Sequence, residues 1–296
     1  MISHAPAWFT NALAAPRRDH EIEVAGAPVH YMEWGDPASP GLVFVHGGAA
    51  HAHWWSFVAP FFAHRWRPVA LDLTGHGDSG RRVHYSHEVW AEEVVAVAAH
   101  ARFPSPPVVI GHSLGGLVAI QTAFAHGQAL AGAVVVDSPV RRPDPESEAG
   151  ARGAAFRSPG TYPDQAAALD RFRLVPDQPC ENRFLVDHVA RHSLLETAHG
   201  WTWKFDPHLF SHTMISMREQ LAGITCRFAL IRGERSVVVP ADTAEYMYEL
   251  LGRSAPFVSI PEAHHHVTLD QPLAFVAALR TLLIDWEHSD PRPPGP

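Results

Sequence analysis

Short apolar segments without polar alternation recur along the chain, separated by longer segments with helical spacing. Runs of this length, rich in valine, isoleucine and leucine, predict strands that are covered on both faces, as in parallel sheets. The apolar segments are residues 42–46 (LVFVH), 68–72 (PVALD), 108–111 (VVIG), 133–137 (AVVVD), 228–232 (FALIR) and 257–260 (FVSI).

Helix-compatible segments separate these predicted strands. A repeated alternation of strand and helix predicts an α/β fold, with a mostly parallel central sheet and helices on both faces. Residues 21–24 and 29–34 predict an antiparallel hairpin ahead of the parallel part. The predicted helices cover residues 53–63, 87–101, 114–126, 241–251 and 271–286.

The alternation is interrupted after Asp137. Residues 138–213 contain many prolines, scattered helical patches and no strand-like run. Because structureless loops of this length are rare, we expect an inserted, mainly helical cap there. The chain then divides into a first core part (1–137), this insertion, a second core part (214–286) and a proline-rich tail (287–296) that is expected to be disordered.

Composition narrows the classes of protein and partner. A chain of 296 residues that is 46% hydrophobic can bury a large core. The net charge of −8 disfavours nucleic acid or an anionic membrane surface as a partner. No apolar run is long enough to span a bilayer and no signal peptide is apparent, so a soluble, cytoplasmic protein is expected. The pattern does not indicate an oligomeric state.

The two cysteines, Cys180 and Cys226, do not form a recognisable pattern. They are too few for a disulfide framework and have no Cys-x-x-Cys spacing, so we expect two thiols that are buried as small apolar groups. Neither a metal nor a cofactor is predicted from them.

The strongest chemical signal is the segment 111–115, which reads G-H-S-L-G directly after a predicted strand and directly before a predicted helix. This context suits a nucleophile elbow, in which the turn is too tight for side chains beside the serine. Free N–H groups at the helix N-terminus favour negative charge next to Ser113. The segment predicts Ser113 as a nucleophile; the alternative is a serine that caps an ordinary helix.

Three further segments extend this signal. Residues 46–48 (HGG) follow the third predicted strand, residues 72–79 (DLTGHGDS) follow the fourth, and residues 263–266 (AHHH) precede 269–272 (LDQP). Together with the elbow, they make residues 21–286 resemble the α/β-hydrolase superfamily, in its cap-bearing branch.

The resemblance implies a serine hydrolase of the α/β-hydrolase fold that needs no cofactor and no metal. The backbone N–H groups of Gly48 and Leu114 are then the expected oxyanion hole. By the family's spacing to Pro272, the general base is His265, and His264 and His266 are loop residues. A three-histidine metal site is the alternative, which we disfavour because consecutive residues seldom converge on one ion.

The acid of the expected triad departs from the family pattern. The usual G-x-x-D segment after the seventh strand reads Gly233-Glu-Arg-Ser236, with serine at the aspartate position. Some relatives carry the acid after the sixth strand, where Asp137 stands, and either place keeps the order serine, acid, histidine. Asp137 is the predicted acid and Glu234 the alternative; Asp137 could instead cap the turn into the insertion.

The resemblance implies cleavage of a small-molecule carboxylic ester, or a related activated carbonyl, through an acyl-enzyme. Trp54, Trp201 and Trp203 are candidates for the wall of the substrate pocket, although the cap rings could instead form the cap's own core. Alternatives with the same triad are a carbon–carbon bond hydrolase of ring-cleavage dienones and a lactonase. A ligand receptor with negligible turnover is the alternative from another class, because the fold alone does not decide function.

Overall fold

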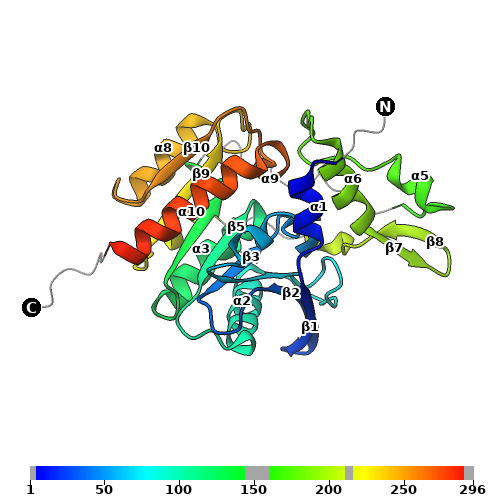
Figure 1. Cartoon of the computed structure of the whole chain (residues 1–296). Coiled ribbons are helices and arrows are strands. Elements are labelled where there is room, and N and C mark those ends of the chain that lie inside the picture. The colour runs from blue at the N-terminus through cyan, green and yellow to red at the C-terminus, as the bar shows by residue number, and fades with distance from the viewer. Residues whose placement is uncertain (1–4, 144–159, 211–215, 290–296) are drawn as a thin grey trace, which may run out of the picture.

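A computed structural model describes residues 5–143, 160–210 and 216–289 of the chain (Figure 1). In this part, an eight-stranded sheet has the order β1-β2-β4-β3-β5-β6-β9-β10. β1 pairs antiparallel with β2 and β2 with β4, whereas all later pairs are parallel. The predicted α/β-hydrolase fold class and the N-terminal hairpin are therefore confirmed. The strands are β1 (Arg17–Val24), β2 (Ala27–Trp34), β3 (Gly41–Val45), β4 (Arg67–Leu71), β5 (Val108–His112), β6 (Gly132–Val136), β9 (Phe228–Gly233) and β10 (Phe257–Ile260).

The central strands are buried along their whole length, because alternate side chains enter two separate apolar clusters. Phe44 of β3 packs in one cluster with Phe275, while Val43 and Val45 pack in the other with Val94. Helices on both faces therefore exclude water from the sheet. The helices of the core are α1 (Ala7–Leu13), α2 (His87–Ala101), α3 (Leu114–His126), η3 (Gly127–Ala129), α7 (Arg218–Ala222), α8 (Ala241–Leu250), α9 (Val267–Asp270) and α10 (Pro272–His288). Among the described helices, none combines the length and the apolar character needed to cross a membrane.

The predicted helix over residues 53–63 is wrong. The segment forms two 3₁₀ turns, η1 (Ala52–Trp54) and η2 (Ala59–Phe62), instead of an α-helix. Residues 54–59 are all buried, so the segment has no polar face to turn to solvent as an amphipathic helix would. Asp72 anchors its start, since the Ala52 N–H donates to Asp72 Oδ1 at 2.6 Å.

The described part of the insertion contains an element that the sequence pattern did not predict. Besides α5 (Gln165–Leu169), α6 (Arg183–His192) and η4 (Pro207–Phe210), it has an antiparallel hairpin of β7 (Leu194–Thr197) and β8 (Gly200–Trp203). The expectation of no strands there is thus wrong, because strands of four residues are too short to give a periodic signal. Figure 1 shows these elements gathered beside α1.

After the β7–β8 hairpin, the chain runs beside the loop that follows β4. Gly77 N–H donates to Lys204 O and Asp206 N–H donates to Gly75 O, both at 2.8 Å. Lys204 Nζ also lies 2.5 Å from Asp78 Oδ1. We call residues 204–206 the strap, because they attach the hairpin to the core.

Two predicted boundaries meet the limits of the described residues. β6 ends at Val136, just before the predicted start of the insertion. The predicted end of the insertion, at residue 213, lies outside the described residues. Residues 290–296 of the predicted tail also lie outside the described residues, and α10 extends to His288, two residues into that tail.

Cys180 and Cys226 are free and partly buried, each next to one of the apolar clusters.

Candidate active site

Ser113 occupies a strained turn between β5 and α3. Its φ of 54° and ψ of −119° are rare for a residue with a side chain. A Cβ on Gly111 would lie 2.0 Å from Gly115 O, and one on Gly115 would lie 2.3 Å from Val45 O. Only glycine fits on both sides of the serine, so the sequence G-x-S-x-G follows from the sterics of this turn.

The His265 imidazole lies between the serine and a carboxylate. Its Nε2 is 3.0 Å from Ser113 Oγ, and its Nδ1 is 2.7 Å from Asp137 Oδ2. Because an ionised carboxylate only accepts, Nδ1 carries the proton and Nε2 presents its lone pair to the serine hydroxyl. This is the arrangement in which a serine can be deprotonated as it attacks.

Asp137 reaches His265 because β9 pairs with β6 on one side and with β10, which precedes the His265 loop, on the other. Asp137 is 1% exposed and follows the end of β6. Its Oδ1 accepts from Gly233 N–H at 2.9 Å, and its Oδ2 accepts from the Ser236 hydroxyl at 2.5 Å. Ser236, at the position where the family pattern places the acid, thus donates to the Asp137 carboxylate.

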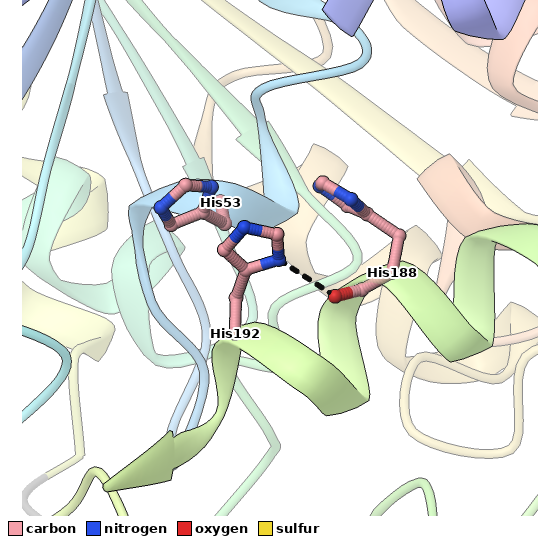
Figure 2. A group of neighbouring side chains, drawn as sticks. All are labelled: His53, His188 and His192. Atoms are coloured by element: carbon pink, nitrogen blue, oxygen red, sulfur yellow. Dashed lines mark hydrogen bonds between the residues drawn. The ribbon is translucent and has the colours of Figure 1, made fainter.

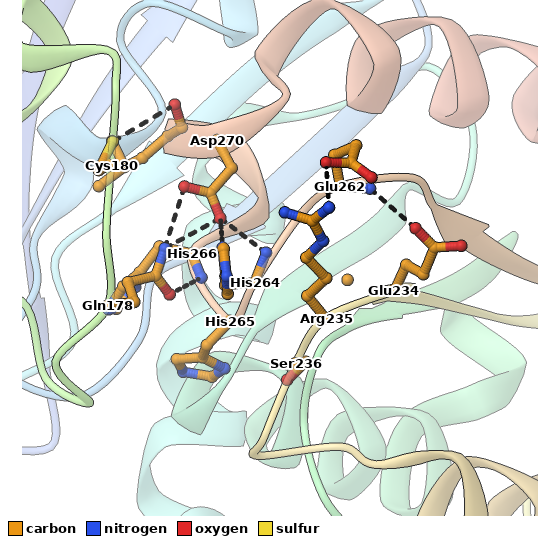
Figure 3. A network of polar contacts seen from close by, with 12 residues as sticks. Gln178, Cys180, Glu234, Arg235, Ser236, Glu262, His264, His265, His266 and Asp270 are labelled. Atoms are coloured by element: carbon orange, nitrogen blue, oxygen red, sulfur yellow. Dashed lines mark hydrogen bonds and ion pairs between the residues drawn. The ribbon is translucent and has the colours of Figure 1, made fainter.

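The alternative acid, Glu234, does not contact His265 in the described structure. Its side chain is exposed and its Oε2 accepts from Glu262 N–H at 3.0 Å. Figure 3 shows Glu234 turned away from the His265 ring, next to the ion pair of Arg235 with Glu262.

The other two histidines of the loop have different surroundings. His264 N–H donates to Asp270 Oδ2 at 2.7 Å, and His266 N–H donates to Gln178 Oε1 at 3.0 Å (Figure 3). Gln178 also donates to Asp270, so the insertion helps to hold the loop. The sequence reasoning missed Gln178, since nothing near it in sequence relates it to the histidines.

His112 of the elbow is a second residue that the sequence reasoning missed. Its Nε2–H donates to the His265 carbonyl at 2.9 Å and so ties the histidine loop to the elbow. Burial, reinforced by His265, lowers the pKa of His112 to about 3. Burial also brings the pKa of His266 well below its usual value, so both rings are neutral near pH 7.

The expected oxyanion loop runs against the serine. A Cβ on Gly47 would lie 3.3 Å from Ser113 Cβ, and both Gly47 and Gly48 line the cavity above the serine. His46 fixes this loop: its Nε2 accepts from Leu73 N–H at 3.1 Å, so Nδ1–H donates to Gly47 O at 2.7 Å. Leu114 begins α3, and its N–H is one of the four that an α-helix leaves unpaired at its start.

A cavity of about 270 Å³ opens above Ser113 and His265. Trp54 and Trp203, two of the three predicted pocket residues, line it. Trp201 does not line this cavity in the described part of the chain; it lies next to the hairpin turn, and its backbone pairs with Tyr162. The sequence reasoning missed three further rings in the wall, since these come from irregular segments: Tyr162, Phe172 and Phe205.

One buried group in the cavity wall, Trp54 Nε1–H, has no hydrogen-bond partner among the described residues. Since buried polar groups are usually paired, a polar atom of a bound molecule is a natural partner for it.

Known proteins resemble the chain in sequence and fold. The sequence profile of the alpha/beta hydrolase family matches residues 42–279. The chain is 29% identical over 277 residues to the esterase Rv0045c of Mycobacterium tuberculosis (89% of either chain). It is 28% identical over 260 residues to a pimeloyl-[acyl-carrier protein] methyl ester esterase of Nitrosomonas europaea (86% of this chain and all of that one).

Solved structures share the fold at low sequence identity. An E-2-(acetamidomethylene)succinate hydrolase has a TM-score of 0.77 at 18% identity, over 91% of this chain and 100% of that one. A thioesterase domain from the curacin biosynthetic pathway has a TM-score of 0.74 at 22% identity, over 91% and 99%. Because the family profile spans most of a chain that also has this sheet and this elbow, the protein belongs to the alpha/beta hydrolase family and is a hydrolase.

Proposed function

We propose that the protein hydrolyses carboxylic esters of small molecules through Ser113, His265 and Asp137. The observation that carries the proposal is the position of the His265 ring, 3.0 Å from Ser113 Oγ and 2.7 Å from Asp137 Oδ2. The esterases among the relatives support the ester as the substrate class.

The chemistry follows from these contacts. His265 Nε2 takes the Ser113 proton as Oγ attacks the ester carbonyl, and then gives that proton to the departing alkoxide. Water, deprotonated by the same nitrogen, releases the acyl group and restores the serine. The N–H groups of Gly48 and Leu114 hold the oxyanion, and one such donor is typically worth about 2.7–4 kcal/mol in the transition state.

The cavity suits a compact ester. Its volume of about 270 Å³ lies near the lower end of small-molecule sites, and aromatic rings make much of its wall. Trp54 Nε1–H offers a hydrogen bond inside it, so a substrate with a polar atom next to a short acyl or aryl group fits best.

The size of the acyl pocket can be tested with p-nitrophenyl esters of graded chain length. Acyl chains of about two to six carbons are expected to give the highest kcat/KM. Trp203→Ala removes a ring from the wall and is expected to improve the ratio of long-chain to short-chain kcat/KM by about tenfold. Trp201→Ala, a matched change on the same strand, is expected to leave the ratio unchanged.

An equal change in the ratio of long-chain to short-chain kcat/KM in Trp203→Ala and Trp201→Ala would contradict this assignment of the pocket wall. The same screen includes lactones and a ring-cleavage dienone. Turnover of one of these well above all esters would replace the ester by that substrate class. Tight binding of a screened compound without turnover of any would favour a receptor.

Asp137→Asn separates the two candidate acids. The amide keeps the size of the side chain but removes the charge that stabilises imidazolium and selects the His265 tautomer. We expect kcat to fall by about 10²–10⁴, since this change in a well-studied triad costs about 10⁴. Glu234→Gln is the matched control and is expected to lose less than about tenfold. Circular dichroism checks that both variants fold; a dead Glu234→Gln with an active Asp137→Asn would reverse the assignment.

A further inference from the structure

Three histidines outside the proposed catalytic triad come together from two distant parts of the chain. His53 belongs to η1 of the core, whereas His188 and His192 belong to α6 of the insertion (Figure 2). One ring nitrogen from each lies within 4.8 Å of the other two. The His53 and His192 rings stack with centroids 3.8 Å apart, and those of His188 and His192 are 4.4 Å apart.

The helix and the turn that carry these rings are both anchored. His188 and His192 are four residues apart, so they share one face of α6, while Leu185 and Val189 are buried. This spacing is the one with which a helix offers two imidazoles to a single zinc ion. On the core side, the bond from Ala52 N–H to Asp72 holds the start of the turn that carries His53.

Backing hydrogen bonds orient the two helical rings. His192 Nδ1–H donates to His188 O at 2.9 Å, so His192 Nε2 keeps its lone pair. Ser56 Oγ lies 2.8 Å from His188 Nε2 and donates to His53 O at the same distance. In histidines that bind metals, the ring nitrogen that does not contact the ion typically makes a hydrogen bond of this kind. His53 Nδ1 is buried and has no hydrogen-bond partner among the described residues.

The surroundings keep the three rings neutral. Burial is the main cause that lowers the pKa of all three, to about 3 for His188, and the charge of Arg17 acts in the same direction. A neutral imidazole is the form that binds a metal, so no proton has to be displaced near pH 7. Each of the three residues is only partly buried.

We propose that His53, His188 and His192 form a binding site for a divalent transition-metal ion such as Zn²⁺, which would link the insertion to the core. Imidazole nitrogens suit Zn²⁺, and three of them with one water complete a tetrahedral site. Zn–N bonds of about 2.0–2.1 Å place the nitrogens about 3.3 Å apart, so the nitrogens must approach by about 1.5 Å at most. The stacked His53 and His192 rings must also turn, so that their in-plane lone pairs converge on the ion.

The ion has a linking role in this proposal, not a hydrolytic one. In zinc peptidases a glutamate directly follows the first histidine of the helical pair and acts as the base. Here Val189 follows His188, and the three ligands include no carboxylate. The inference does not depend on the proposed ester hydrolysis.

Co²⁺ titration of the full chain tests the site, because tetrahedral Co²⁺ has visible d–d absorption bands. We expect one equivalent to bind with these bands and Zn²⁺ to displace it. His192→Gln and His53→Gln should each weaken binding by more than about 100-fold, since loss of an outer partner alone costs about 10–100-fold. His126→Gln is the matched control, because His126 also ends a helix and lies 3.0 Å from Glu92 outside the cluster.

Two results would overturn the proposal. One is a wild-type chain that binds no Co²⁺. The other is Co²⁺ binding that persists in His192→Gln and in His53→Gln, both with native circular dichroism spectra, and that disappears when a phosphonate blocks Ser113. The ion would then belong to the second histidine group, His112, His265 and His266. A melting temperature raised by Zn²⁺ in wild type and in His126→Gln, but not in His192→Gln, would support the link.

Discussion

Ser113→Ala is expected to lower kcat for p-nitrophenyl esters by about 10⁶-fold, the loss seen when the serine of a triad is removed. The hydroxyl is the group that faces His265 Nε2, and alanine leaves the base without a proton to take. Folding should be unaffected, since alanine carries the same Cβ through the turn at φ 54°. Steady-state kinetics with circular dichroism on the same samples checks both expectations.

Ser193→Ala is the matched control for this change. Ser193 also lines the cavity, but its hydroxyl donates to Val189 O and lies 2.9 Å from His51, so less than about tenfold loss is expected. A fluorophosphonate should add its mass to the peptide that contains Ser113 and to no other. Activity of Ser113→Ala within about tenfold of wild type, or about 1.4 kcal/mol in barrier, would mean that another residue is the nucleophile.

His265→Ala is expected to reduce kcat by a similar factor, about 10⁶-fold, because removal of the base in a triad costs about as much as removal of the serine. The adjacent histidines provide built-in controls. His264 faces Asp270, with its Nδ1 3.4 Å from Oδ2, and His266 has no contact with Ser113 Oγ or Asp137 among the described interactions. Each of His264→Ala and His266→Ala should therefore lose far less than His265→Ala.

Two outcomes for these three variants would contradict the assignment of His265 as the base. If His264→Ala or His266→Ala is the inactive one, the loop in solution places its histidines one position away from the arrangement described above. If all three remain active, imidazole is not the base, and the proposed function fails with it.

The strands could be predicted from the sequence because they are buried on both faces. β3 to β6 are apolar at every position or nearly so, and the predicted limits differ from the observed ones by one residue at each end at most. The segment 53–63 is equally apolar but forms 3₁₀ turns, because apolar content without a period does not distinguish a strand, a helix and a buried loop.

The elbow could be predicted for a local reason, whereas the sequence favoured Asp137 as the acid without excluding Glu234. Gly111 and Gly115 are required by contacts within a few residues of Ser113 or with the adjacent strand, so the motif carries its own geometry. The choice between Asp137 and Glu234 depends on which of two neighbouring strand ends faces the His265 loop, and no local pattern shows this. Only the positions of Ser236 and of the His265 ring in space distinguish them.

The strap has a practical consequence for protein engineering. Exchange of insertions between hydrolases is a direct way to change substrate range, and a natural cut would fall at the end of β8, after Trp203. When this chain is the recipient, that cut leaves the strap residues Lys204 and Asp206 with Gly75, Gly77 and Asp78, which they bond. The foreign hairpin would then join a strap that is already fixed to the core. A junction placed after Asp206 would instead remove the strap, so residues 75–78 would also have to be matched to the donor.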